Sequence, residues 1–165
     1  MYSSINEFLA DWSNESTFTQ KILDNLTDES LNQKVYEEGR NIGFLAWHIV
    51  NSIGKMANRT GLAVKEFDAD KAPENAKEIA DAYKEAANSL KEEVRAKWND
   101  KTLYEEVDMY GEMWKNSVTL QVLVRHQIHH RAQITVLMRQ AGVKVPGIYG
   151  PSKEEWAAMG IPPMK

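Results

Sequence analysis

The chain has 165 residues, of which 42% are hydrophobic and 27% are charged, as in a soluble globular domain. Its 24 acidic and 20 basic side chains give a net charge of −4, which argues against non-specific binding to nucleic acid. The absence of cysteine excludes disulfides, thiolate metal sites and a cysteine nucleophile, and it suits a reducing cytosol.

The first residues, "MYSSINEFLADW", lack the basic start and the apolar run of a signal peptide. No apolar stretch approaches the roughly 20 residues that span a bilayer. We therefore expect a cytoplasmic protein that has no membrane partner. Residues 1–165 are expected to form one domain.

Four long helices are predicted where apolar residues recur at spacings of three and four. They cover, approximately, Ser4 to Leu26, Asn41 to Asn58, Pro73 to Trp98 and Asn116 to Gln140. Pro73 is a plausible first helical residue. The second helix is apolar on most sides, which is typical of a central helix in a bundle.

Between the third and fourth helices, "LYEEVDMYGEMW" alternates like a strand, but Gly111 interrupts it. We expect an irregular connection over one end of the bundle. In the tail, Ser152 and Glu155 have the spacing of a capping box, and a short helix is expected to end at Gly160 to Pro163. The predicted fold is all-α, an antiparallel four-helix bundle with a short C-terminal helix.

Three of the four histidines lie in "VRHQIHHRAQI", and the fourth, His48, lies in "FLAWHIV". At about 100° per residue, His126, His130 and Gln133 share the predicted inward stripe of the fourth helix. His129 lies roughly 60° to the other side, nearer the edge of the buried face. The better pair is therefore His126 and His130.

Each buried imidazole needs a partner, because an unpaired nitrogen costs about 1–3 kcal/mol. The histidines can bond to each other, to a carboxylate or to a metal ion, and the apolar faces carry almost no carboxylates. His48 interrupts the most apolar helix, so it is the obvious third ligand. Three imidazoles leave a position open for water or substrate, as in catalytic sites. A structural role for the histidines stays open as the alternative.

The other motifs and residues in the sequence indicate less about function. The H-E-x-x-H motif, the Glu-x-x-His pairs of di-iron bundles, nucleotide-binding glycine loops and G-x-S-x-G are absent. Gln133 is a candidate to hold an imidazole N–H. Trp47 is either a core aromatic or a pocket wall, and Tyr110 either roofs the site or covers the bundle end. Arg131 is expected at the surface or at an interface.

Three segments together, "GFLAWHI", "VRHQIHHRAQITVLMRQAG" and "VPGIYGPSKEEWAAMGIPP", resemble the DinB/YfiT-like superfamily of bacterial metal-binding four-helix bundles. The resemblance covers essentially the whole chain. It implies a divalent metal, often zinc or nickel, held by His48, His126 and His130, with no ligand role for His129. It also implies a homodimer formed through helix faces, and a link to stress response but not to DNA binding.

The resemblance implies less about the reaction. Some relatives resemble S-transferases or isomerases that use mycothiol or bacillithiol, and others are described as metal-dependent hydrolases. We expect a metal-dependent enzyme in which a low-molecular-weight thiol attacks an electrophilic small molecule. One alternative is hydrolysis by metal-bound hydroxide, for which Glu112 and Asp108 are the candidate general bases. A non-catalytic metal-binding protein is the other alternative.

Overall fold

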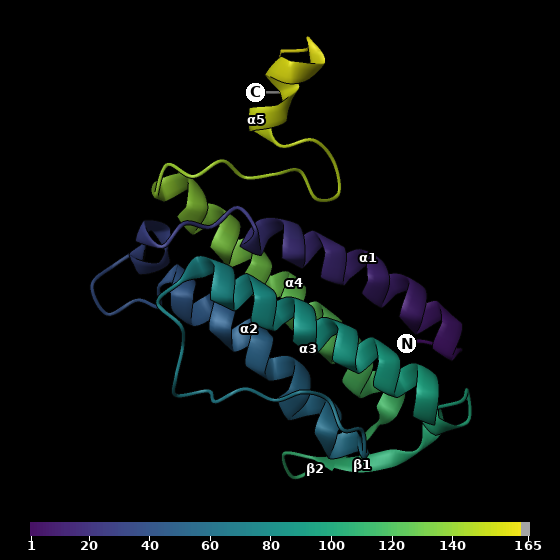
Figure 1. Cartoon of the computed structure of the whole chain (residues 1–165). Coiled ribbons are helices and arrows are strands. Elements are labelled where there is room, and N and C mark those ends of the chain that lie inside the picture. Colours follow the sequence, from purple (N-terminus) through teal and green to yellow (C-terminus); the bar gives the residue numbers. More distant parts are fainter. Residues whose placement is uncertain (163–165) are drawn as a thin grey trace.

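The computed structural model describes residues 1–162. Its long helices are α1 (Ile5–Leu23), α2 (Ile42–Ala57), α3 (Ala76–Lys97) and α4 (Asn116–Gln140), which pack as a bundle (Figure 1). The predicted all-α fold is confirmed, and each helix begins and ends within three residues of its predicted bounds. None of the helices in residues 1–162 is long and apolar enough to cross a membrane.

Side-chain caps fix the starts of the first three helices. Ser4, Asn41 and Asn75 each accept a hydrogen bond from the backbone N–H three residues further on. These bonds satisfy N–H groups that have no partner inside the helix. The prediction that Pro73 is the first residue of the third helix is wrong, because the Asn75 cap places the start at Ala76.

The helices follow one another around the bundle in the order α1, α3, α2, α4. The pairs α1/α3 and α2/α4 run antiparallel, whereas α2 and α3 run parallel (Figure 1). The parallel pair is possible because the connection over residues 61–75 returns along α2. Asn58 donates to the carbonyl of Val64 at 3.0 Å, and Trp47 donates to that of Asp68 at 3.1 Å. The antiparallel pair α2/α4 carries the histidines.

A β-hairpin covers the end of the bundle where α4 begins (Figure 1). Its strands are β1 (Glu106–Met109) and β2 (Glu112–Lys115). The prediction of an irregular connection is wrong here. Tyr110 and Gly111 both have positive φ, 61° and 92°, as in the two-residue turns that suit hairpin twist. Gly111 therefore closes the hairpin instead of interrupting a strand.

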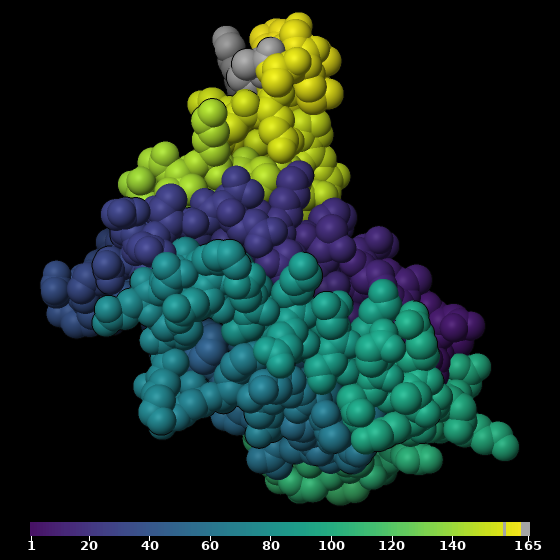
Figure 2. All heavy atoms as spheres, viewed as in Figure 1, coloured from purple at the N-terminus to yellow at the C-terminus, as the bar shows by residue number. Residues whose placement is uncertain are grey.

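The C-terminal segment projects from the bundle beside α1 (Figure 2) and carries the short helix α5 (Lys153–Trp156), as predicted. The Glu155 carboxylate accepts hydrogen bonds from the backbone N–H groups of Gly147 at 2.9 Å and Ser152 at 3.2 Å. Within the described residues the Ser152 hydroxyl has no partner, so only half of the predicted capping box forms. Pro163 lies outside the described residues.

Candidate metal centre

The three histidines selected from the sequence meet between α2 and α4. The Nε2 atom of His126 lies 3.0 Å from Nε2 of His48 and 3.2 Å from Nε2 of His130. One nitrogen from each of the three rings lies within 4.8 Å of the others. In the part of the chain that the structure describes, no other group of three or more histidine, aspartate or glutamate side chains has this arrangement.

The position of the cluster on α4 differs from the sequence prediction. The buried face of this helix runs through Leu123, Gln127, Arg131 and Ile134, and not through His126. His126 is half-buried, and Gln133 is exposed. The polar character of Gln127 and Arg131 hid the true centre of the buried face. His126 therefore lies at the edge of this face, whereas His130, one turn further on, is buried.

The three nitrogens suit a shared cation better than they suit one another. Gln133 Oε1 lies 2.7 Å from Nδ1 of His130, which places that ring's proton on Nδ1 and its lone pair on Nε2. Two ligands of a tetrahedral zinc ion at about 2.0–2.1 Å lie roughly 3.3–3.4 Å apart, close to the distances of 3.0 Å and 3.2 Å from the His126 nitrogen to the other two. Imidazole ligands suit zinc, nickel, copper and iron. The residues present therefore fit a divalent metal.

Burial also keeps these imidazoles neutral. Burial, together with smaller contributions from the neighbouring His130 and His48 rings, lowers the pKa of His126 to about 4. Burial is likewise the main cause that holds the pKa of His48 and of His130 below their ordinary value. Near pH 7 the rings are therefore unprotonated, as a metal ligand must be.

Gln133 makes the contact expected of a residue that orients a metal-binding histidine, here His130. Its carboxamide fixes the His130 tautomer, and such outer contacts are worth about 10–100-fold in metal affinity. We expect Gln133→Leu to weaken zinc binding by about that factor, and Gln133→Glu, which keeps an acceptor, to preserve it. Competition with a chromogenic chelator measures both. Equal affinities in all three proteins would show that this contact has no part in the site.

Two other candidates, Trp47 and Tyr110, make their contacts with residues outside the three-histidine group. Trp47 is buried, and its ring nitrogen donates to the carbonyl of Asp68 at 3.1 Å, so it anchors the 61–75 connection. Tyr110 lies exposed on the hairpin turn, with the Arg59 guanidinium 4.4 Å from its ring centroid. Arg59 follows His48 by eleven residues, roughly 16 Å along the helix axis. Of the two roles considered for each, these contacts favour core packing for Trp47 and end covering for Tyr110.

The expectation that Arg131 lies at the surface is wrong. It is 3% exposed and forms an ion pair of 2.8 Å with Glu15 of α1, which is 6% exposed. Sequence reasoning missed Glu15, although it continues the three-and-four spacing of Phe8, Trp12 and Thr19. A carboxylate at an inward position was the signal for a buried cationic partner.

A pocket of about 550 Å³ adjoins His130. Its residues come from α2, α4 and the connection before α2: Val35, Tyr36, Glu38, Arg40, Leu45, His129, His130, Gln133, Val136 and Leu137. His129 is exposed and borders the pocket, but it lies outside the three-histidine group. Tyr36, Glu38 and Arg40 could not be selected from the sequence, because the connection that carries them has no periodicity. The pocket thus borders one of the three clustered histidines, and its size suits a small molecule.

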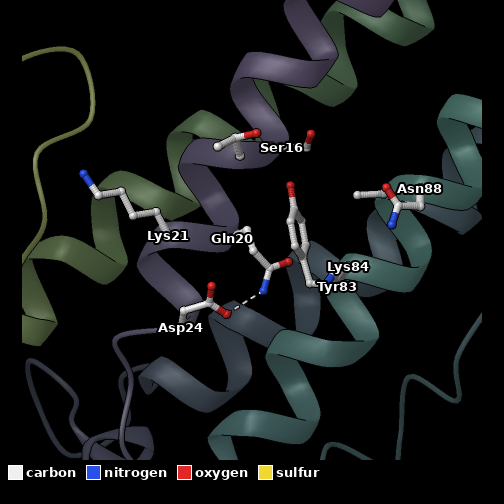
Figure 3. Close-up of a pocket in the computed structure, with 9 residues that line it drawn as sticks. Ser16, Gln20, Lys21, Asp24, Tyr83, Lys84 and Asn88 are labelled. Atoms are coloured by element: carbon white, nitrogen blue, oxygen red, sulfur yellow. Dashed lines mark hydrogen bonds between the residues drawn. The ribbon is translucent and has the colours of Figure 1, made fainter.

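A second pocket, of about 360 Å³, lies between α1 and α3 (Figure 3). Several of its polar groups already have partners: Gln20 donates to the Asp24 carboxylate at 2.7 Å and to the Ala80 carbonyl at 3.1 Å. The Tyr83 hydroxyl donates to the Gln127 carboxamide at 2.5 Å. This pocket holds no cluster of metal ligands among the described residues, so the histidine site is the better candidate.

The fold and the cluster define a class of protein: a helical bundle whose three converging histidines can hold a divalent metal. The chain belongs to the DinB family, whose sequence profile matches residues 1–164.

Known relatives agree with this assignment. The chain is 43% identical over 162 residues to the uncharacterized protein YrdA of Bacillus subtilis strain 168, and the match covers 98% of this chain and 97% of YrdA. The crystal structure of a DinB-like protein from Bacillus cereus is 44% identical, with a TM-score of 0.87, over 90% of this chain and 100% of that one. A DinB-like protein of Bacillus subtilis, YjoA, has a TM-score of 0.69 at 20% identity, over 88% and 98% of the two chains, which shows the fold alone.

Proposed function

We propose that the chain is a metal-dependent S-transferase. His48, His126 and His130 would hold one zinc or nickel ion, and a low-molecular-weight thiol of the bacillithiol type would attack an electrophilic small molecule in the pocket. The convergence of three Nε2 atoms beside a pocket of about 550 Å³ carries this proposal. The chain has no cysteine, so the sulfur must come from a cosubstrate.

When bound, the metal would lower the pKa of a coordinated thiol and make the thiolate available near neutral pH. The chain supplies neutral imidazoles, and Gln133 orients one of them. The apolar side chains of Leu45 and Leu137 border the pocket, where they can hold the electrophile and exclude water. The carbon–sulfur bond forms as the leaving group departs with its electron pair, and the thiol proton passes to solvent.

Hydrolysis is the second candidate, and it needs a general base. The candidate Asp108 forms an ion pair with Arg59 at 4.0 Å, and Glu112 accepts a hydrogen bond from Trp114 at 2.9 Å. Both belong to the hairpin at the end of the bundle. Glu38, in contrast, borders the pocket itself, where its carboxylate could act as the general base. This position is the one observation that favours hydrolysis.

The two candidates differ in their need for a thiol. We expect the zinc-loaded protein to consume a monohalobimane faster than the uncatalysed reaction only when bacillithiol or mercaptoethanol is added. His126→Ala should remove the acceleration. If the protein still accelerates monohalobimane consumption without added thiol, the transferase proposal is wrong. Hydrolysis of a nitrophenyl ester that needs the metal and drops in Glu38→Gln would support the second candidate instead.

A further inference from the structure

Arg40 lies on the rim of the pocket that adjoins His130. Its guanidinium carbon is 4.6 Å from the centroid of the Phe44 ring. That ring in turn stacks on the His48 imidazole, with centroids 6.0 Å apart and an interplanar angle of 11°. A stack of guanidinium, phenyl and imidazole groups therefore leads from the pocket rim to the three-histidine cluster.

Within residues 1–162, the Arg40 side chain has no carboxylate partner and forms no hydrogen bond, whereas most arginines of the chain form an ion pair there. Four of the six arginines form ion pairs in that range: Arg59, Arg95, Arg131 and Arg139. Arg125 also has no ion pair there, but it lines a different pocket with Met1 and Tyr2. Arg40 thus combines a place in the candidate site with N–H donors that no described residue occupies.

The connection before α2 holds Arg40 in this position. The backbone N–H of Ile42 donates to the carbonyl of Gln33 at 3.1 Å and closes the loop at its base. Inside the loop, Gly39 N–H donates to the Tyr36 carbonyl at 2.9 Å, and a Cβ on Gly39 would lie 3.0 Å from that oxygen. The Phe44 ring supports one face of the guanidinium, which leaves its edge donors for a planar anion.

We propose that the small molecule bound at this site carries a carboxylate, which Arg40 binds while the reacting group lies at the three-histidine cluster. This inference rests on the proposed function, because it assumes that a reactant binds beside the histidines. Glu38 lies on the same rim and repels anions, so it confines the carboxylate to the side of Arg40. The carboxylate belongs to the thiol or to the electrophile, and the test separates these sources.

The first arm measures binding and not turnover. The cobalt-substituted protein is titrated with mercaptopropionate and mercaptohexanoate, and with mercaptopropanol and mercaptohexanol as neutral thiols of matched length. The thiolate-to-cobalt charge-transfer absorption reports binding. We expect the unaltered chain to prefer a mercaptocarboxylate, and Arg40→Ala to weaken that thiol about tenfold while changing the matching alcohol less than about twofold. Arg40→Lys should fall between, because it keeps the charge and loses the two-pronged geometry.

The second arm compares iodoacetate with iodoacetamide as electrophiles at a fixed concentration of mercaptoethanol. A rate that falls in Arg40→Ala for iodoacetate alone assigns the carboxylate to the electrophile. Arg125→Ala is the matched control for loss of one positive charge, and it should change neither preference. Glu38→Gln should leave carboxylate binding unchanged or strengthen it.

The outcomes separate the two proposals. If Arg40→Ala changes charged and neutral reactants alike, or changes none of them, the assignment of Arg40 is overturned and the transferase proposal stands. If no thiol produces the charge-transfer absorption with the cobalt-loaded unaltered chain, the transferase proposal itself fails, and the inference about Arg40 fails with it. Metal content is measured for every variant, so loss of the ion cannot imitate loss of the carboxylate contact.

Discussion

Replacing His126 with alanine is expected to abolish stoichiometric metal binding, whereas the unaltered chain is expected to bind about one zinc or nickel ion. His126 contributes the nitrogen that lies within 3.2 Å of both other Nε2 atoms, so its loss leaves only two imidazole ligands. The fall in affinity should exceed the roughly 10–100-fold that is typical of losing an outer contact such as Gln133. Elemental analysis after dialysis against the metal measures the effect.

A second measurement does not depend on activity. A ligand that binds only the folded chain stabilises it in proportion to the logarithm of its concentration over its Kd. Added zinc should therefore raise the unfolding temperature of the unaltered chain and leave that of the alanine variant unchanged. His48→Ala and His130→Ala should behave as His126→Ala does.

His129→Ala is the matched control for these substitutions. Its ring centroid lies 4.9 Å from that of His130, so it is a neighbouring histidine of the same helix, yet it is exposed and outside the cluster. It should keep the metal. Equal metal content in all four variants would show that the three histidines are not the ligands.

The grouping of His48, His126 and His130 could be predicted because it depends on local facts. A spacing of four residues in a helix puts two side chains on one face, one turn apart. An imidazole within an apolar helix such as α2 has to find a polar partner in the bundle. Neither argument needs the tertiary structure, and the structure brings the same three rings together.

The rotation of α4 could not be predicted in the same way. Its buried face includes Gln127 and Arg131, which a count of apolar residues assigns to solvent. Tyr83 of α3 donates a hydrogen bond to Gln127, and Glu15 of α1 accepts one from Arg131, and these bonds make the burial of both side chains possible. The two partners lie 44 and 116 residues away along the chain, respectively. The pattern of one helix therefore cannot reveal them.

The pocket rim shows a similar limit. Tyr36, Glu38 and Arg40 belong to a connection without periodicity, and their position beside His130 follows from the backbone bond between Ile42 and Gln33. The hairpin was more nearly predictable, because the strand-like alternation of apolar and polar residues in "LYEEVDMYGEMW" is visible in the sequence. Gly111 has the positive φ that a tight turn requires, so it marked a turn and not a defect.

The largest effect on stability is expected from Arg131→Met. The Arg131 guanidinium lies 2.8 Å from the Glu15 carboxylate, 3.1 Å from the Thr19 hydroxyl and 2.6 Å from the Tyr149 hydroxyl. Removing it leaves Glu15 as a buried charge without its cation, which costs about 3–5 kcal/mol. The free energy of unfolding, measured by urea denaturation, should fall by that amount. In a chain of this size the unfolding temperature should fall by roughly 10 °C.

Two further variants separate a buried ion pair from ordinary packing. Arg131→Met combined with Glu15→Leu removes both charges, and apolar replacement of a whole pair is often close to neutral, so most of the lost stability should return. Tyr149→Phe removes one hydroxyl of a largely exposed ring and should cost only about 1 kcal/mol. If the double variant is as unstable as Arg131→Met alone, the cost comes from lost packing of the long arginine side chain. Because Arg131 directly follows His130, unchanged zinc affinity in the refolded double variant would also show that the ion pair stabilises α4 without shaping the metal site.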